Sequence, residues 1–396
     1  MRLHLTFLWL LMLGSFTAEA AETPSQLPRK TICLNMIVKN ESRVIERCLE
    51  SVKNIGIDYW VIVDTGSDDG TQKIIQNVMK DIPGELYERP WVNFGYNRTE
   101  ALNLAKNRAD YLLFIDADEI AEIETPLDKC SLTCDGYLIP VRISDDVNIS
   151  LQRAFLVSTA LDWSWKNVLH ERLTTPQETE ILHPLPGMAI SAMSKDGNRS
   201  QDPQKYLKDA HLLEKALEKE PDNADYVYYL AQSYFNTGRY DLALKNYEKR
   251  AGMKGWDQAT FWSQYYVGVL QQQLGFPSES FIHAYCKAFQ LRPTRAEPLY
   301  RLANYFYCTN NFILSYAAAE IARHIPVPND LIYIEYWIYN HALPFVFANS
   351  AFLMGKYEEA EITYRQLLAI QDLPLEYQEK VTQNLQRLKD VKNALQ

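Results

Sequence analysis

The hydrophobic pattern of this 396-residue chain changes once, near Pro203, and that change constrains the fold more than any other feature. From residue 31 to about residue 200, short apolar runs typical of strands alternate with segments of helical spacing. After Pro203 the spacing stays helical to the end of the chain. We therefore expect two domains, an α/β domain over residues 30–202 and an all-α domain over residues 203–396.

The α/β domain is expected to hold a mostly parallel sheet with helices on both faces, because strand and helix alternate along it. The predicted strands and extended segments cover residues 32–38, 60–63, 86–91 and 111–115, and the predicted helices cover residues 44–52, 72–79 and 98–107. In such sheets, ligands lie beyond the carboxyl ends of the strands. Polar residues follow Val38, Val63 and Ile115 at that edge.

Two of these polar segments contain residue types that bind ligands. Residues 64–71 include two glycines, which allow a ligand to approach the backbone. An ordinary polar turn that caps the next helix through Thr71 is the alternative. Asp116 and Asp118 follow an apolar strand, and residues two apart on a strand face the same way. Paired carboxylates suit Mg²⁺ or Mn²⁺, and a solvated acidic loop is the alternative.

Residues 33–41, 63–71 and 112–119, with Arg98 ahead of the third segment, resemble the nucleotide-binding half of family 2 glycosyltransferases of the GT-A fold. The resemblance covers about residues 30–200 and implies a Rossmann-like sheet, a nucleotide sugar as co-substrate and a divalent metal, Mn²⁺ or Mg²⁺. It implies that Asp116 and Asp118 hold the metal. The donor-binding residues that it implies are Asn40, Glu41, Asp64, Gly66, Ser67, Asp69, Arg98 and Asp116.

Residues 152–155 and 163–171 resemble the acceptor-side segment of the same family. Glu171 is the candidate catalytic base, because an inverting transfer needs a carboxylate to accept the acceptor's proton. A glutamate that pairs locally at the surface is the alternative. Trp163 and Trp165 are candidates for stacking on an acceptor sugar, or else for core packing. His170 is a further acceptor-side candidate, or a histidine bonded within its own loop.

The all-α domain has the small-residue and aromatic spacing of tetratricopeptide helix pairs. The same turn position recurs at Gly238, Gly275, Asn311 and Gly355, in steps of 37, 36 and 44 residues. One pair cannot bury its apolar face alone, so we expect about four stacked pairs and a final helix from Leu375 as a cap. Of the 25 tyrosines, 20 lie in this domain, which predicts packing between helices.

Two arginines, Arg292 and Arg295, lie around Pro293 at a turn between helix pairs. They are expected to anchor the array to the first domain or to bind an anionic or sugar acceptor. A turn held by arginine–carboxylate pairs is the alternative. The order of domains resembles bacterial and viral glycosyltransferases that contain tetratricopeptide repeats.

Residues 1–20 resemble a secretory signal peptide, with Arg2 ahead of an apolar run and a small-x-small site at Ala18 to Ala20. The apolar run covers residues 5–16, and twelve helical residues span about 18 Å against a bilayer core of about 30 Å. We therefore expect export to a periplasmic, secreted or lumenal location and no stable transmembrane span. A tether through an uncleaved N-terminal anchor is the alternative. Export also permits a disulfide between Cys130 and Cys134, with two free thiols as the alternative.

Two classes of function follow from these features. The first is a metal-dependent, inverting, hexosyltransferase-type enzyme that moves a sugar from a UDP- or GDP-sugar to a glycan, peptide or protein held by the repeats. The second is a weak or inactive glycosyltransferase-like domain carried by a protein-binding scaffold. Residues 189–196 lack the late histidine of many GT-A enzymes, and this favours the second class. The net charge of −10 argues against nucleic acid as a partner.

Overall fold

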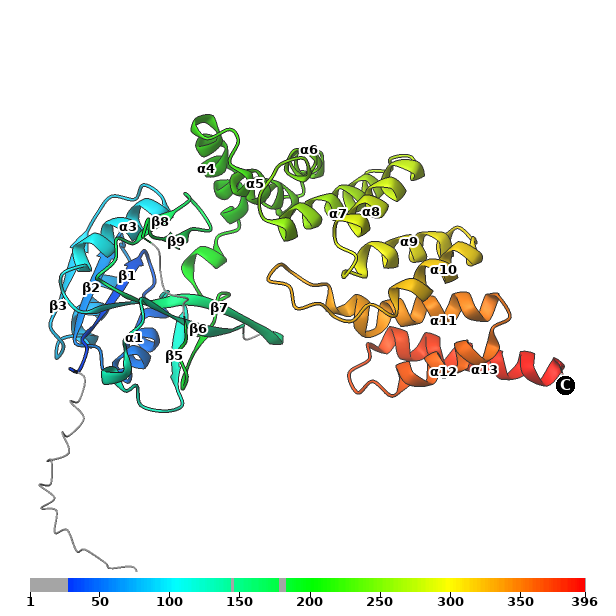
Figure 1. Ribbon diagram of the computed structural model, residues 1–396, viewed down its shortest axis with the longest axis horizontal. Coiled ribbons are helices and arrows are strands. Elements are labelled where there is room, and N and C mark those ends of the chain that lie inside the picture. Colours follow the sequence, from blue (N-terminus) through cyan, green and yellow to red (C-terminus); the bar gives the residue numbers. More distant parts are fainter. Residues whose placement is uncertain (1–27, 144–145, 178–182, 396) are drawn as a thin grey trace, which may run out of the picture.

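The computed structural model describes residues 28–143, 146–177 and 183–395, so the predicted signal peptide lies outside the described residues. A sheet domain comes first and an array of helices follows it to the C-terminus (Figure 1). The predicted fold class, an α/β domain followed by an all-α repeat domain, is confirmed. The last short helix of the sheet domain ends at Gln201, and the first helix of the array begins at Lys205.

Within the described residues, nine strands of the sheet domain form one mixed sheet in the order β3-β2-β1-β4-β7-β6-β11-β5, with β10 beside β6, and β8 pairs with β9. The strands are β1 (Ile32–Val38), β2 (Tyr59–Asp64), β3 (Gly84–Glu88), β4 (Tyr111–Phe114), β5 (Glu119–Ile123), β6 (Gly136–Ile143), β7 (Asp146–Ser158), β8 (Ser164–Lys166), β9 (Arg172–Thr174), β10 (His183–Pro184) and β11 (Met188–Ala192). The helices are α1 (Ile45–Lys53), α2 (Thr71–Val78), α3 (Phe94–Ala105) and the short η1 (Lys129–Ser131) and η2 (Asn198–Gln201).

The first four strands are parallel, as their alternation with helices predicts. Helix α3 begins at Phe94, four residues before the predicted start, because the Asn93 side chain caps it by accepting a hydrogen bond from the Tyr96 backbone N–H at 2.8 Å. After β4 the sheet continues through antiparallel pairs, β4 with β7 and β7 with β6. The mixed second half of the sheet was not predicted.

Strand β7 runs past the end of β4. Leu113 of β4 lies opposite Leu156 of β7, so the residues of β7 before Leu156 extend beyond the carboxyl end of β4. Side chains two apart on a strand share a face. Arg153 and Phe155 therefore lie over the segment that follows β4, at the edge where a ligand is expected.

In the described part of the chain, the repeat domain contains a leading helix, four helix pairs and a final helix. The leading helix is α4 (Lys205–Lys219), the pairs are α5 (Ala224–Asn236) with α6 (Tyr240–Ala251), α7 (Asp257–Gln273) with α8 (Ser278–Leu291), α9 (Glu297–Cys308) with α10 (Phe312–Ala322) and α11 (Leu343–Leu353) with α12 (Tyr357–Leu368), and the final helix is α13 (Leu375–Leu395). The short π-helix η3 (Ile338–Ala342) leads into α11. The predicted four pairs and final helix are confirmed.

The turn inside each pair holds one residue in the left-handed region. Gly238, Gly275 and Gly355 have φ of 74°, 74° and 75°. In the third pair this residue is Asn310, with φ of 59°, and not the predicted Asn311. Asparagine tolerates the left-handed region better than most residues, and a one-residue difference in spacing cannot be read from the pattern alone.

Residues 323–337 form an insertion between α10 and η3 that lengthens the third step of the repeat. Arg292 pairs with Asp330 of this insertion, and Arg295 contacts both Glu297 (2.5 Å) and Asp330 (3.0 Å). The Arg295 side chain is fully buried beside the rings of Phe261 and Trp262. The alternative of a turn held by arginine–carboxylate pairs is therefore confirmed, because Arg295 has no exposed atoms to offer an acceptor.

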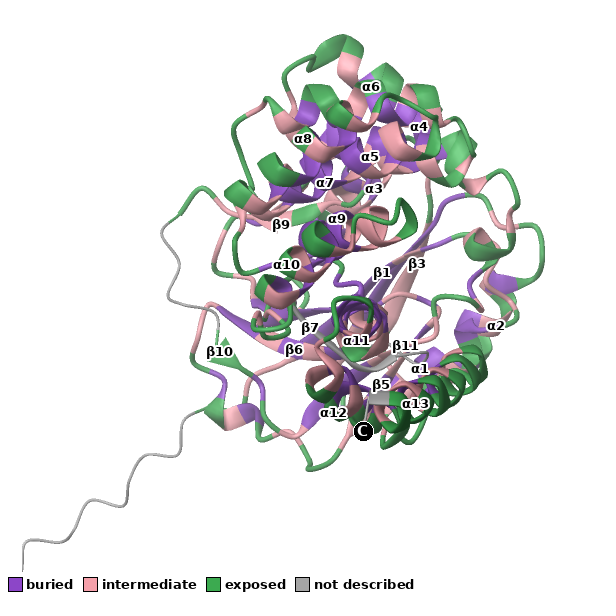
Figure 2. Ribbon diagram, turned by 90° about the vertical axis from the view of Figure 1, so that its right-hand side faces the viewer, coloured by how far each residue is buried: buried purple, intermediate pink, exposed green. Residues whose placement is uncertain are grey.

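The core of the repeat domain is rich in tyrosine. Tyr247, Tyr265, Tyr285 and Tyr364 are fully buried between helices, and Figure 2 shows buried residues along the interior of α5 and α7. The prediction that tyrosines pack between helices is confirmed for these four side chains. They supply large apolar area, and hydroxyl partners such as Asn349 for Tyr364 (2.6 Å) remove the cost of burying a polar group.

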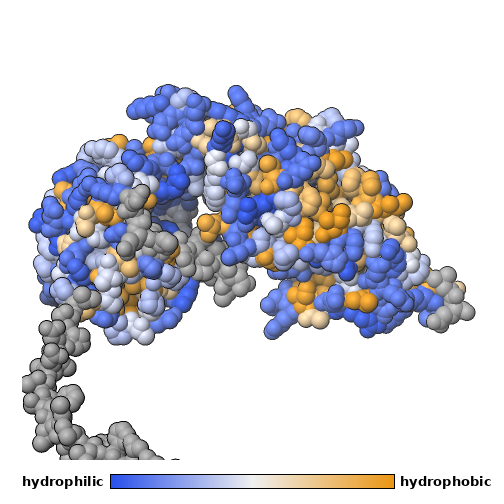
Figure 3. All heavy atoms as spheres, viewed as in Figure 1, coloured by the Kyte–Doolittle hydropathy of each residue, from blue (hydrophilic) through white to orange (hydrophobic). Residues whose placement is uncertain are grey.

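The outer face of α10 exposes three large aliphatic side chains. Ile313, Leu314 and Ile321 of this helix are 68%, 45% and 57% exposed, and Figure 3 shows hydrophobic side chains gathering over the right half of the molecule. Across residues 28–143, 146–177 and 183–395, no helix is long and apolar enough to cross a membrane.

Cys130 and Cys134 are free thiols in this structure. Of the two alternatives for this pair, a disulfide or two free thiols, the structure therefore shows the second.

Candidate functional site

Two loops at the carboxyl edge of the sheet are joined by hydrogen bonds. The loop after β1 begins at Asn40, whose φ of 57° turns the chain. The Asn40 backbone N–H donates to the Ser67 hydroxyl at 2.8 Å, and its side-chain carbonyl accepts from the Asp68 N–H at 2.9 Å. The Glu41 N–H donates to Thr71 Oγ1 at 2.8 Å. The structure thus brings the predicted donor residues of both loops together.

Asp64, the last residue of β2, is fully buried, and only one of its two carboxylate oxygens accepts hydrogen bonds from the described residues. Its Oδ1 accepts hydrogen bonds from the backbone N–H groups of Gly66 and Ser67, both at 2.7 Å. Its Oδ2 is buried and has no hydrogen-bond partner within the described part of the chain. A buried acceptor without a donor is costly. This oxygen is therefore suited to a ligand that brings an N–H or O–H group.

Arg98, on the inward face of α3, joins two carboxylates that lie far apart in the sequence. Its Nη2 contacts Asp116 Oδ1 at 2.5 Å, and its Nε contacts Glu171 Oε1 at 2.5 Å. The side chains of Arg98 and Glu171 are each 13% exposed. The guanidinium also lies 5.4 Å from the ring centroid of Trp165. Arg98, Asp116, Trp165 and Glu171 thus form one cluster, which we call the arginine cluster.

The arginine cluster lines a cavity of about 280 Å³. Phe114, Arg153 and Phe155 also line it. The resemblance placed residues 152–155 in the acceptor-side segment, but it did not name Arg153 or Phe155 as a binding residue, and Phe114 was expected only as part of the strand before Asp116. The available signal was the alternation of residues 152–155, which places Arg153 and Phe155 on one face of a strand. The cavity therefore has both charged and aromatic walls, a combination that fits a polar ligand bearing rings.

Neighbouring charges control the acidic groups of the site. Burial raises the pKa of Asp116, but the charges of Arg98 and Arg153 outweigh it and the pKa lies below its ordinary value. Burial and the charge of Asp116 raise the pKa of Asp118. The same two causes raise the pKa of Glu119 to about 7, and burial raises the pKa of Glu41 to about 7. The site is short of positive charge on the Asp118 side.

Asp116 and Asp118 do not lie on one face of a strand, contrary to our prediction. β4 ends at Phe114 and β5 begins at Glu119, so both aspartates lie in the turn between them. Asp116 faces Arg98, and Asp118 lies against Gly197. The rule of alternating faces does not apply because the chain has already left the strand.

The side chains around this turn determine whether it could bind a metal ion. Among the residues that the structure describes, no three or more His, Cys, Asp or Glu side chains converge to hold a metal ion. Mg²⁺ is commonly held by one or two carboxylates together with substrate phosphates. Asp118, with its raised pKa and its shortage of positive charge, fits a metal that is completed by a diphosphate. The roles of Asp116 and Asp118 as metal ligands stay predictions.

Because Gly197 has no side chain, the Asp118 carboxylate can pack directly against its backbone. A Cβ at this position would lie 2.6 Å from Asp118 Oδ2. We expect Gly197→Ala to raise the dissociation constant of a nucleotide sugar in Mn²⁺ by about 10- to 100-fold, because a carboxylate displaced by about 1 Å loses its geometry. Isothermal calorimetry measures this change. Gly252→Ala is the matched control, since its nearest contact would lie at 3.5 Å. Equal affinities in the two variants would contradict the prediction.

The three predicted acceptor-side residues lie in different surroundings in the structure. Trp165 lies in the arginine cluster, and its indole nitrogen is buried without a partner in the described residues. Trp163 is 7% exposed in the core, and its indole N–H donates to the Ser158 carbonyl at 2.9 Å. For Trp163 the structure therefore supports the alternative of core packing, because its ring is enclosed. The His170 ring stacks on Tyr229 of α5, and the structure does not place it in the cavity lining.

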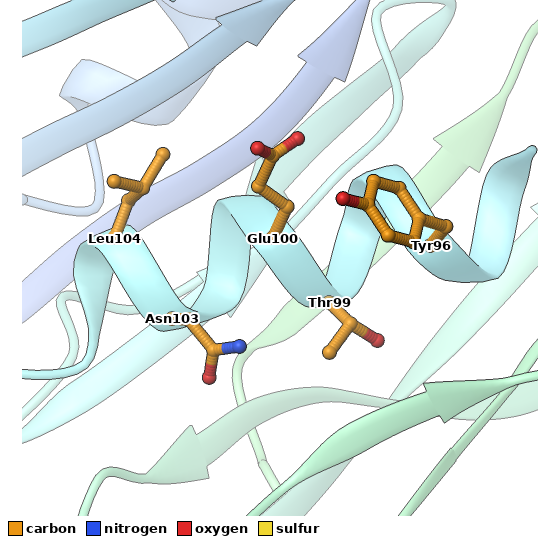
Figure 4. Close-up of a pocket in the computed structure, with 5 residues that line it drawn as sticks. All are labelled: Tyr96, Thr99, Glu100, Asn103 and Leu104. Carbon is orange, nitrogen blue, oxygen red and sulfur yellow. The ribbon is translucent and has the colours of Figure 1, made fainter. Parts of the chain in front are cut away.

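A second hollow, of about 350 Å³, lies on the outer side of α3. Figure 4 shows Tyr96, Glu100 and Leu104 along one side of this helix, and Thr99 and Asn103 along the other. All five side chains come from one helix, and Glu100 is already paired with Arg89 at 3.2 Å. We therefore place the candidate active site at the arginine cluster and not at this larger hollow.

The fold and site define a class: an α/β domain with ligand-facing loops at its carboxyl edge, followed by helical repeats. The family model described as Glycosyl transferase family 2 matches residues 33–126, and a tetratricopeptide repeat model matches residues 212–245. The resemblance to family 2 glycosyltransferases is therefore confirmed over residues 33–126 of the first domain, and the resemblance to tetratricopeptide repeats over residues 212–245 of the array.

Curated relatives agree with this assignment. An uncharacterized glycosyltransferase of Rickettsia bellii is 37% identical over 95 residues, which cover 24% of this chain and 30% of the relative. Glycosyltransferase SunS, from a prophage of Bacillus subtilis, is 23% identical over 224 residues, which cover 54% of this chain and 50% of the relative. Among solved structures, the crystal structure of MamA covers 45% of this chain and 92% of its own at 17% identity and a TM-score of 0.34. The chain spans half or less of the length of these two curated relatives.

Proposed function

We propose that this protein transfers a hexose from a UDP- or GDP-sugar to a glycan, peptide or protein acceptor with inversion. The observation that carries the proposal is the arginine cluster, in which one arginine holds two carboxylates at the wall of a cavity. The unpaired Asp64 Oδ2 nearby supports recognition of a nucleotide base. The repeats support a protein partner or an acceptor bound by the array.

In the proposed reaction, an acceptor oxygen attacks the anomeric carbon from the face opposite the diphosphate. Glu171 accepts the acceptor's proton as the carbon–oxygen bond to the diphosphate breaks. Its Oε1 is held by Arg98, and no hydrogen bond from the described residues reaches its Oε2. Arg98 offsets the negative charge that builds up on the leaving nucleoside diphosphate. A divalent cation at Asp118, with Asp116 beside it, would supply further positive charge there.

Binding of the donor tests the proposal directly. We expect at least one common UDP- or GDP-sugar to bind in Mn²⁺ by calorimetry, and Asp118→Ala to abolish this binding and donor turnover while the circular dichroism spectrum stays unchanged. The exposed Asp241→Ala variant in α6 serves as the control. Absence of binding at millimolar concentration for every donor would overturn the proposal in favour of a scaffold.

We further propose that the chain is exported through its N-terminal segment or tethered by it. The charged and apolar pattern of residues 1–20 supports this location. An exported enzyme of this kind needs a compartment that contains sugar nucleotides, which a lumen or a host cell would provide.

A further inference from the structure

The loop that carries Glu171 has an unusual backbone. It runs from Asn167 to Glu171, between β8 and β9, and Arg172 is the first residue of β9. Asn167 and His170 have φ of 76° and 52°, in the left-handed region that non-glycine residues seldom adopt. Two such residues within four positions persist only where the surroundings hold the chain firmly. The contacts of this loop therefore decide where Glu171 lies.

The sheet domain holds the loop from one side. The Phe94 backbone N–H donates to the Val168 carbonyl at 3.2 Å. Gly95 allows the close approach, because a Cβ at this position would lie 2.2 Å from the Asn167 carbonyl oxygen. These contacts tie the loop to the start of α3, the helix that also carries Arg98.

Helix α5 of the repeat domain holds the other side through its first turns. The Tyr226 hydroxyl accepts a hydrogen bond from the Val168 N–H at 3.2 Å. Asp225 Oδ2 accepts from the Asn167 amide at 3.3 Å and pairs with Arg172 at 2.8 Å.

The loop also packs against the repeat domain. The His170 and Tyr229 rings stack with centroids 3.9 Å apart and planes 19° from parallel. Leu169 is 4% exposed and lies in the hydrophobic core of the repeat domain. Glu171 thus follows two residues packed on this domain and precedes one paired with α5.

We infer that helix α5 of the repeat domain positions the active site, and that its Tyr226 and Asp225 are positioning residues for Glu171. This inference rests on the proposed function. The repeat domain contacts the residues on both sides of the candidate base, and Arg98 of α3 holds the base itself. A displacement of α5 therefore moves the Glu171 carboxylate relative to the donor, while the donor loops after β1 and β2 keep their own hydrogen bonds.

A pair of tyrosines on α5 provides a matched test in the full chain. Tyr226→Phe removes the hydroxyl that holds Val168, and Tyr234→Phe removes a hydroxyl that contacts Glu214 of α4. Both rings are buried, so the packing change is the same. We expect Tyr226→Phe to lower kcat for release of nucleoside diphosphate about tenfold with unchanged donor KM, and Tyr234→Phe to change neither.

Asp225→Asn and Asp257→Asn form a second pair, since both remove a charge from the first turn of a repeat helix. We expect only Asp225→Asn to lower kcat. Amide hydrogen exchange supplies a readout that does not need turnover: residues 167–172 are expected to exchange faster in Tyr226→Phe and Asp225→Asn than in the two controls. Unchanged exchange and unchanged kcat would overturn the inference. A wild-type chain that turns over no donor would refute the proposed function, and the exchange rates alone would then decide the positioning role.

Discussion

Glu171→Gln is expected to lower kcat by about 10²- to 10⁴-fold, the loss typical of a missing general base. Glutamine keeps the length of the side chain and an oxygen that accepts the hydrogen bond from Arg98 Nε. It no longer accepts a proton from the acceptor, so the chemical step slows while donor binding is preserved. Release of nucleoside diphosphate measures kcat, and calorimetry measures the affinity for the donor.

Glu100→Gln is the control for that experiment. Glu100 lies on the outer side of α3, in the second hollow, two residues after Arg98. The same chemical change there is expected to leave kcat unaltered. A large loss in Glu100→Gln with none in Glu171→Gln would move the active site to the outer hollow.

Replacing Arg98 by methionine is expected to lower the free energy of unfolding by about 3–5 kcal/mol. The arginine is the shared partner of Asp116 and Glu171, and its removal leaves the largely buried Glu171 carboxylate without its counter-ion and Asp116 with Arg153 alone, at 4.0 Å. Donor binding should be lost as well. Urea denaturation followed by circular dichroism measures the stability, and Arg98→Lys, which keeps the charge, serves if the methionine variant does not fold.

The exposed pair of Arg108 and Glu85 provides a comparison at the same distance of 2.5 Å. Solvent screens this pair, so Arg108→Met is expected to cost much less stability than Arg98→Met. An equal decrease in the free energy of unfolding in the two variants would show that the arginine cluster stabilises the fold no more than an exposed ion pair does.

Much of the first half of the sheet domain was predictable because its signals are local. The strand of residues 32–38 is found as predicted, and polar residues after each apolar run do meet at one edge. The preceding strand and the two glycines marked residues 64–71 as a possible ligand-binding turn, and the resemblance added the donor-binding role of Asp64. Arg98 and Glu171 were assigned by resemblance, and their contact across 73 positions is visible only in the structure.

The remaining features depend on contacts between distant segments. Arg153 enters the site because β7 pairs with β4 in antiparallel register and overruns it, and no local pattern specifies that pairing. Gly197 matters only because Asp118 packs against it. Trp163 and Trp165 alternate along the same segment, and only the enclosure of Trp163 by the core separates their roles.

The burial of Leu169 has a consequence for folding. This side chain belongs to the first domain in sequence, but it is packed within the core of the second. Unfolding the repeats would expose it and remove the support of two left-handed residues beside it. The hydrophobic pattern changes near Pro203, but we do not expect the two sides of that boundary to unfold independently. The part of the sheet domain that carries Glu171 and the first helix pair are expected to melt as one unit. We therefore expect that the sheet domain does not reach its native state when it is expressed alone.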